Sequence, residues 1–305
     1  MGVQALSEQP EQAINLEPAA SLYAQCLIPG MGKADENPGD SRNDEDLLVC
    51  GVCGQPKEMW LTLKGDEDKP PLRVRVLCRC QQEKLDAEEA YAATQRRKMR
   101  NEETLGLLRE IGAALPISYD FGMYDGGSEK NFGQAKYYAD HFDRMLSENI
   151  GLLFYGNTGR GKTFYSEAIA RSVIDKGYLA VYTRIPNLAE AMKSNDGRDR
   201  AWLLRVIERC DLLVLDDLGA ERDTAWMLEQ AELIIDTRYK SKRPVIVTTN
   251  LDPRDLISAE DLARKRPYER IMEMCRPVEI VGENRRTQLA ARRSAAWEKI
   301  LGENE

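Results

Sequence analysis

A glycine-rich segment at residues 156–163, reading GNTGRGKT, constrains the fold of this chain more than any other feature of its sequence. It follows an apolar run at 151–155 and precedes a helical pattern over 164–176, which is the context that a phosphate-binding P-loop requires. Glycines let backbone N–H groups converge on phosphate oxygens, and the following helix directs its positive N-terminal end at the same anion. The sequence therefore predicts an α/β fold whose nucleotide ligands are Gly156, Asn157, Thr158, Gly159, Arg160, Gly161, Lys162 and Thr163.

Two carboxylates and one amide follow later apolar runs, where a P-loop protein needs them. The run 212–215 ends in Asp216 and Asp217, and the run 245–249 ends in Asn250. An acidic pair after a strand is a common loop by itself, but about fifty residues beyond a P-loop it is a specific signal. If the strand 245–249 lies between the other two, Asn250 lies beside the γ-phosphate; the alternative is a simple strand-end turn.

These side chains predict distinct roles in nucleotide chemistry. Lys162 is expected to contact the β- and γ-phosphates, and Thr163 and Asp216 are expected to hold Mg²⁺. Asp217 is expected to orient or deprotonate the attacking water, next to Asn250.

The segments around these motifs alternate between short apolar runs and amphipathic stretches, which predicts a parallel sheet covered by helices on both faces. Each apolar run is expected to be a buried strand. The expected strands are 151–155, 179–183, 212–215, 245–249 and 277–281, and the expected helices are 134–148, 164–176, 201–209 and 224–239.

Composition argues against several classes of protein. No run of about 18 apolar residues occurs and the start of the chain has no secretory signal pattern, so a cytoplasmic protein without a membrane span is expected. The single histidine, His141, argues against Ser-His-Asp hydrolysis and His-rich metal catalysis. Residues 1–49 hold nine acidic and two basic side chains, a net charge of −7 out of −8 for the whole chain. The remaining residues can therefore carry local basic surfaces.

Three segments lie outside the sheet pattern. Residues 1–45 are rich in Glu, Asp, Pro, Ala and Gly, which predicts a disordered acidic tail with a short helix near 21–27. Residues 82–114 lack proline and are crowded with Ala, Glu, Gln, Arg and Leu, which predicts a helical linker. Its basic run at 96–100 is interpreted as a solvated face, with a phosphate-contacting patch as the alternative. Residues 291–305 are expected to form a C-terminal tail.

Four of the seven cysteines lie in two close pairs, which indicates a metal site in a module spanning residues 46–81. Zn²⁺ prefers four tetrahedral thiolates, and two short cysteine pairs on turns can meet at one ion. The alternatives are a redox dithiol or disulfides, against which a reducing compartment argues. A module this small cannot bury a sufficient core without such an ion. The predicted ligands are Cys50, Cys53, Cys78 and Cys80.

The runs 151–163, 211–222 (DLLVLDDLGAER) and 245–250 together resemble the AAA+ ATPases of the DnaC/DnaI type, the bacterial and phage replicative helicase loaders, which are grouped with the IstB transposition helpers. The resemblance covers residues 115–290. It implies an AAA+ P-loop NTPase core with a five-stranded parallel sheet in three α/β/α layers, preceded by the zinc module and the helical linker. Residues after Arg285 are too few for the C-terminal helical lid of standard AAA+ proteins, an absence that the resembled family shares.

The resemblance also implies a role for each site residue: Lys162 and Thr163 are Walker A, Asp216 and Asp217 are Walker B, and Asn250 is sensor 1. The spacing Arg266-x-x-x-Arg270 matches the family's box VII helix, which gives Arg270 the position of the arginine finger. Arg286, or its neighbour Arg285, takes the position of a sensor 2 arginine.

The function implied is ATP-dependent loading of a DnaB-type replicative helicase onto single-stranded DNA, with the zinc module docking on the helicase and a homo-oligomer forming on ATP binding. Most AAA+ proteins have Asp-Glu in Walker B, so Asp216-Asp217 predicts slow, switch-like ATP hydrolysis. Residues 264–293 carry nine basic against four acidic side chains, and the surplus is expected to contact DNA phosphates. The alternatives are an IstB-like transposition helper and a nucleotide-gated adaptor with negligible turnover.

Overall fold

The computed structural model describes residues 33–62, 70–194, 197–220, 224–258 and 262–302. The chain divides into two compact units, Met1–Ala93 and Thr94–Glu305. The boundary falls inside the long helix α2 (Arg79–Glu110), so one helix contributes residues to both units.

The second unit is built on a five-stranded parallel sheet with strand order β6-β7-β8-β5-β9. This confirms the predicted sheet, with strand ends shifted by at most three residues from those expected. Strand β8 lies between β5 and β7, which is the arrangement that Asn250 requires. The strands are β5 (Gly151–Tyr155), β6 (Ala180–Thr183), β7 (Leu212–Leu218), β8 (Val245–Thr249) and β9 (Cys275–Glu279).

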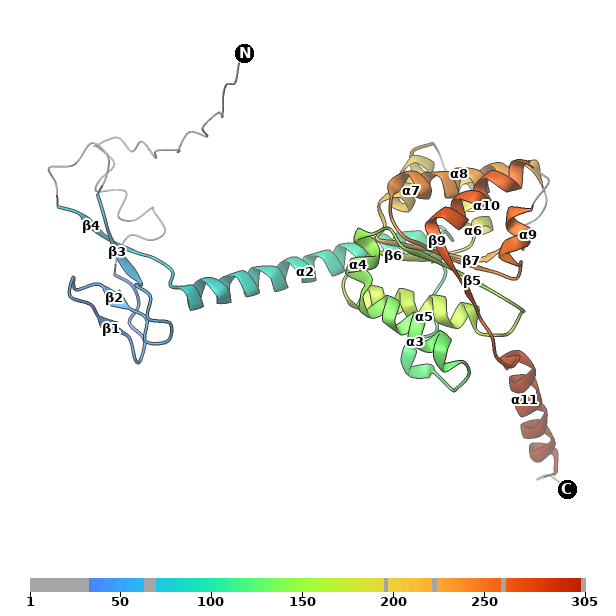
Figure 1. Ribbon diagram of the computed structural model, residues 1–305, viewed down its shortest axis with the longest axis horizontal. Helices are drawn as coiled ribbons and strands as arrows, with labels where there is room; N and C mark the ends of the chain where they lie inside the picture. Colours follow the sequence, from blue (N-terminus) through green and yellow to red (C-terminus); the bar gives the residue numbers. More distant parts are fainter. Residues whose placement is uncertain (1–32, 63–69, 195–196, 221–223, 259–261, 303–305) are drawn as a thin grey trace, which may run out of the picture. The chain divides into compact units, whose positions relative to one another are not determined.

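Side chains alternate between two hydrophobic cores along each central strand, as expected where both faces of a sheet are covered. Leu153 of β5 packs into one core with helices α6, α7, α8 and α10, and Phe154 packs into the other with α3, α4 and α5. Figure 1 shows these two helical layers on opposite faces of the sheet. The helices are α3 (Glu129–Asp140), α4 (Phe142–Ser147), α5 (Lys162–Asp175), α6 (Ile185–Ser194), α7 (Gly197–Arg209), α8 (Ala225–Ser241), α9 (Pro253–Ile257) and α10 (Leu262–Met274).

One predicted helix is two helices in the structure. The expected helix over 134–148 corresponds to α3 and α4, which are separated at His141. His141 leaves the helical conformation and its ring Nδ1 lies 2.9 Å from the carbonyl oxygen of Tyr137, which satisfies the end of α3. Tyr138 of α3 and Phe142 of α4 are both buried, so the two helices direct apolar side chains into the core.

The predicted linker helix is present, and its C-terminal part packs on the sheet unit. Leu105 and Leu108 are buried in the core that also holds α6 and α8. Asn101 Nδ2 donates to the carbonyl oxygen of Gly177 at 3.0 Å. In the basic run predicted to be solvated, Arg97 instead pairs with Asp211 at 3.1 Å. From Thr94 onward α2 is part of the sheet unit.

The first unit begins earlier than predicted. Residues 33–45 were expected to be disordered tail, but β1 (Ser41–Arg42) pairs with β2 (Leu48–Val49) in an antiparallel ladder. Asp40 also forms a 2.6 Å ion pair with Lys57, and both side chains are buried. A second hairpin consists of β3 (Glu58–Leu61) and β4 (Leu72–Arg75). The predicted short helix near 21–27 lies outside the described residues.

After β9 the chain forms helix α11 (Arg285–Gly302), so residues 291–302, predicted as a tail, continue a helix. A three-residue helix, η2 (Phe121–Met123), precedes α3. Within the described part of the chain, no helix combines the length and the apolar character needed to cross a membrane.

Candidate nucleotide-binding site

A cavity of about 320 Å³ opens at the carboxyl ends of the sheet strands, between the P-loop and the acidic pair. Five predicted residues with reactive side chains converge on it: Lys162, Thr163, Asp216, Asp217 and Asn250. Thr158, Gly159, Gly161, Arg285 and Arg286 also line this cavity, whereas Gly156, Asn157 and Arg160 line an adjoining one.

The P-loop connects β5 to α5 in a conformation that glycine alone suits. Gly156, Gly159 and Gly161 have φ angles of 126°, 80° and 101°, a region that L side chains rarely adopt. A Cβ on Gly156 would lie 2.9 Å from the carbonyl oxygen of Ile280, so the loop also lies tightly against the segment after β9. The loop therefore presents its backbone without side chains at these three positions.

Lys162, the first residue of α5, directs its ammonium group into a cage of oxygen atoms. Its Nζ lies 2.7 Å from the carbonyl oxygen of Gly156, 3.0 Å from that of Asn157 and 2.8 Å from Oδ1 of Asn250. Burial lowers the pKa of Lys162, and the nearby carboxylate of Asp217 opposes that shift. A cation is thus held where the loop can neutralise phosphate charge.

Asp216 is buried and its carboxylate is fully hydrogen-bonded. Oδ1 accepts from Oγ1 of Thr248 at 2.8 Å and from Oγ1 of Thr163 at 3.2 Å. These oxygen atoms of Thr163 and Asp216 are hard donors, and adjacent ligands of an octahedral Mg²⁺ lie about 3 Å apart. The donor set and its spacing therefore fit Mg²⁺ at this position.

Asp217 reaches the same cavity because the strand is irregular there. Consecutive residues of a regular strand point to opposite faces, but the β7–β8 register shifts between Leu215 and Leu218. Asp217 has a φ of 62°, and its backbone N–H donates to Oγ1 of Thr248 at 2.8 Å. The bulge turns both carboxylates toward one cavity, as their predicted roles require, but the bulge itself was not indicated by the sequence pattern.

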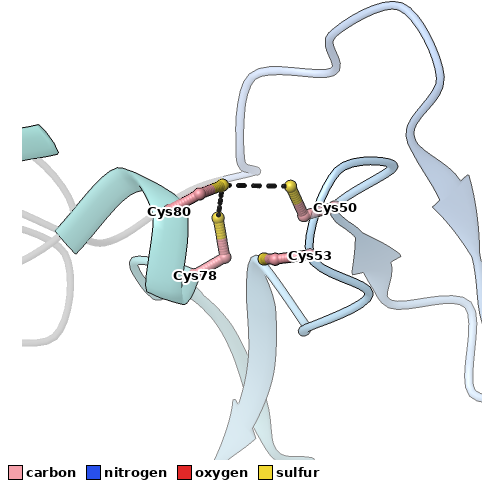
Figure 2. A group of neighbouring side chains, drawn as sticks. All are labelled: Cys50, Cys53, Cys78 and Cys80. Carbon is pink, nitrogen blue, oxygen red and sulfur yellow. Dashed lines mark hydrogen bonds between the residues drawn. The ribbon is translucent and has the colours of Figure 1, made fainter. Parts of the chain in front are cut away.

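The first unit brings the four predicted zinc ligands together. Figure 2 shows the side chains of Cys50, Cys53, Cys78 and Cys80 directed at a common centre, and their sulfur atoms all lie within 4.8 Å of one another. The closest sulfur pairs are 3.3 Å and 3.5 Å apart, and tetrahedral Zn–S bonds of about 2.3 Å place sulfur atoms about 3.8 Å apart. Four thiols at this spacing fit a structural Zn²⁺.

The surroundings of the cysteines affect their thiols in opposite directions. Backbone N–H groups lower the pKa of Cys53 to about 6, while hydrogen bonds with Cys78 and Cys50 raise the pKa of Cys80 to about 12. Gly51 fits the turn between the first pair because a Cβ there would lie 2.0 Å from the carbonyl oxygen of Gly39. The segment before the predicted module thus helps to shape the turn that carries Cys50 and Cys53.

A family model for the IstB-like ATP binding protein matches residues 83–293, more than two thirds of the chain. The chain belongs to this family. Its predicted AAA+ fold class is confirmed by this membership together with the strand order β6-β7-β8-β5-β9. The recognised resemblance to the DnaC/IstB group is confirmed as well.

Individual relatives of this IstB-like protein are replicative helicase loaders. It is 30% identical to the replicative helicase loader DnaI of Bacillus subtilis over 148 residues, which cover 45% of this chain and 47% of DnaI. It is 27% identical to the replicative helicase loader DnaC of Escherichia coli over 133 residues, which cover 43% of this chain and 53% of DnaC. The matches thus span about half the length of these relatives. A crystal structure of the DnaC helicase loader superposes with a TM-score of 0.47 at 26% identity, covering 53% of this chain and 96% of that one.

The predicted arginines lie at different places in the IstB-like core. Arg285 and Arg286 both line the cavity, and Arg285 forms a 2.6 Å ion pair with Asp125. Arg270 lies on α10, does not line the cavity and pairs with Asp236 of α8 at 3.0 Å. Arg270 therefore has no contact with the site of its own chain.

Among the cavity residues that sequence reasoning missed is Arg184. It follows β6 directly, lines the cavity and lies 3.1 Å from Oδ2 of Asp216. Partial burial lowers the pKa of Arg184. The hydrogen bond with Asp216 and the charge of that carboxylate raise the pKa by more, so the net shift is upward. The sequence did contain a signal for Arg184. Tyr182 and Arg184 are two residues apart at the end of an apolar run, a spacing that places both side chains on one face of a strand.

Proposed function

We propose that this chain is an ATP-dependent loader of a DnaB-type replicative helicase onto single-stranded DNA. The observation that carries the proposal is the hydrogen-bonded set of Lys162, Asn250 and Asp217, which unites the P-loop with the acidic pair in a member of an ATP-binding family. The relatives DnaI and DnaC are named as replicative helicase loaders, which supports the choice of partner.

The chemistry proposed at this site is slow ATP hydrolysis. The P-loop backbone and Lys162 bind the phosphates, and Thr163 and Asp216 hold Mg²⁺, which when bound neutralises phosphate charge. Asp217 orients the attacking water and Asn250 keeps Asp217 in place, since its Nδ2 lies 3.3 Å from the Asp217 carboxylate. The short side chain of Asp217 favours a switch over fast turnover.

We propose that the two parts of the chain have different roles. The zinc module docks on the helicase, and the ATPase core assembles in a nucleotide-dependent way. Three apolar side chains of the β3–β4 hairpin support docking: Met59, Leu61 and Leu72 lie on one face, and each is more than one third exposed. The basic surplus over 264–293 is proposed to contact single-stranded DNA.

A binding experiment with the full chain tests the proposal. The purified replicative helicase of the source organism should co-elute with wild-type protein in size-exclusion chromatography with ATP. The double variant Met59→Ser and Leu61→Ser should lose the complex. The matched control, Met99→Ser and Leu107→Ser, alters two apolar side chains on α2 that are even more exposed, and it should keep the complex. Absence of a wild-type complex would contradict helicase loading.

The IstB-like family model favours a second candidate, a transposition helper that binds duplex DNA. An electrophoretic shift assay separates the two, because a loader prefers single-stranded DNA and a transposition helper prefers duplex. A third candidate, a nucleotide-gated adaptor, predicts normal helicase binding with no steady-state ATP turnover, with or without single-stranded DNA.

A further inference from the structure

The carboxylate of Asp216 is bound on both of its oxygens by different parts of the molecule. Oδ1 faces the hydroxyls of Thr163 and Thr248. Oδ2 accepts from Oη of Tyr182 at 3.0 Å and from Nη2 of Arg184 at 3.1 Å. The oxygen that suits Mg²⁺ and the oxygen that is anchored are therefore different atoms of one carboxylate.

The anchor arises from the local geometry of β6. This strand pairs in parallel with β7, with Tyr182 opposite Val214 and Thr183 opposite Leu215, so Arg184 continues the register opposite Asp216. Side chains two residues apart in an extended chain share a face, which directs Tyr182 and Arg184 to the same carboxylate. Tyr182 is buried, whereas the Arg184 side chain is 46% exposed.

We propose that Arg184 is a positioning residue for Mg²⁺: by holding Oδ2 it keeps Oδ1 of Asp216 turned toward Thr163. Arg184 donates to Oδ2 through both Nε and Nη2, so without it the hydroxyl of Tyr182 would remain as a donor, and one hydrogen bond restrains rotation of a carboxylate less than three. Partners that orient a metal ligand typically account for about tenfold or more in metal affinity. The inference extends the proposed ATP site and does not depend on helicase loading.

A simple electrostatic argument predicts the opposite result. The guanidinium of Arg184 carries a positive charge beside the metal site, so by repulsion alone its removal should strengthen Mg²⁺ binding. Positioning predicts that removal weakens Mg²⁺ binding. Because the two effects differ in sign, the measurement decides between them.

The test measures the affinity of the full-length chain for a fluorescent ATP analogue, once in excess Mg²⁺ and once in EDTA. The ratio of the two affinities reports the contribution of the metal, independently of turnover. For Arg184→Ala we expect this ratio to fall about tenfold, with the affinity in EDTA unchanged. Arg184→Lys retains the positive charge and one nitrogen donor atom, so it should give a smaller fall in this ratio.

Arg243→Ala provides the matched control, because Arg243 pairs with Asp211 at 2.9 Å at the opposite end of β7. It should leave both affinities at wild-type values. An unchanged or raised ratio for Arg184→Ala would overturn the inference, as would an equal fall in both affinities, which would indicate direct contact with the nucleotide. A wild-type ratio of one would contradict the proposed Mg-ATP site itself, and the helicase-binding assay would still stand.

Discussion

Oδ1 of Asn250 lies 2.8 Å from Nζ of Lys162, and Nδ2 of the same side chain lies 3.3 Å from Oδ1 of Asp217. A single amide thus connects the P-loop cation to the acidic pair. The connection is possible because β8 lies between β5 and β7, so that Asn250, the residue directly after β8, lies near both neighbouring strand ends. Asn250 therefore lies where it can hold Lys162 and Asp217 in fixed positions relative to each other.

This relationship leads us to expect that Asn250→Ala impairs turnover more than binding. Loss of the amide leaves Asp217 without this partner, and removing one aligned polar group from such a site costs about 100-fold in rate. Affinity for the fluorescent ATP analogue should change less than about threefold, since Lys162 retains two carbonyl partners. Asn187→Ala, whose amide contacts Gly112, is the control. Equal losses of turnover and affinity would contradict this assignment.

Lys162→Ala should instead abolish productive nucleotide binding. The substitution removes the cation that balances the β- and γ-phosphates, and we expect affinity for Mg-ATP to fall by about 100-fold or more. Arg160→Ala is a matched control, because Arg160 is also a P-loop cation but donates to the carbonyl oxygen of Gly282, and Arg160 lines the adjoining cavity. Titration with the fluorescent analogue measures both. Similar losses in the two variants would mean that the loop acts by charge alone.

The ATP-binding core could be predicted well from the sequence because its signals are local. Five apolar runs and one glycine-rich loop give the strands and the phosphate site directly, and the chain order of motifs indicates which strand ends meet. The bulge at Asp217 and the Arg184 anchor could not be predicted in the same way. Both depend on the register between neighbouring strands, which single-strand patterns do not specify.

The start of the cysteine-containing first unit was misplaced for a related reason. Residues 33–45 have the polar, charged composition of a disordered segment, and nothing in their local pattern indicates a partner. Their order comes from long-range contacts: Ala34 N–H donates to the buried Glu58 carboxylate at 2.9 Å, and Asp40 pairs with Lys57. Hydrogen bonds to Lys57 and to backbone N–H groups hold the pKa of Asp40 at about 2.

Arg238 offers a test of stability in the ATP-binding core. Its side chain is fully buried, and its guanidinium donates to the carbonyl oxygens of Ile207, Cys210 and Pro244. Arg238→Leu would leave these acceptors unsatisfied, so we expect destabilisation of about 3 kcal/mol, or about 6–12 °C in melting temperature. Arg243→Ala, on a partly exposed ion pair, should cost less than about 1 kcal/mol. Comparable melting temperatures would refute the structural role.

The zinc assignment predicts metal content. Elemental analysis of the purified chain should give about one Zn²⁺ per chain, and Cys53→Ser or Cys78→Ser should lose it, because a structural site needs all four ligands. Cys275→Ser is the control, since Cys275 lies in strand β9 and its sulfur contacts the carbonyl oxygen of Val245. A wild type that is folded and free of metal would end the zinc proposal.

The remaining prediction concerns Arg270, which makes no contact with the cavity of its own chain and pairs with Asp236. We propose that it completes the ATP site of a neighbouring chain. Arg270→Ala should then bind ATP nearly as wild type but lose turnover and ATP-dependent assembly. The effect should lie at or below the low end of about 10³–10⁵ known for arginine fingers, because the proposed water-activating residue, Asp217, has a short side chain.

Two comparisons decide whether Arg270 acts between chains. Asp236→Asn removes the ion pair but keeps the arginine, so it should retain turnover, whereas a purely structural pair would make both variants alike. Mixing Arg270→Ala with Lys162→Ala chains should restore part of the activity, because some interfaces then combine an intact P-loop with an intact arginine. Steady-state ATPase rates across protein concentrations measure both effects. Full activity of Arg270→Ala alone would exclude the role between chains, and loss of ATP binding by the monomeric variant would place the arginine in its own site.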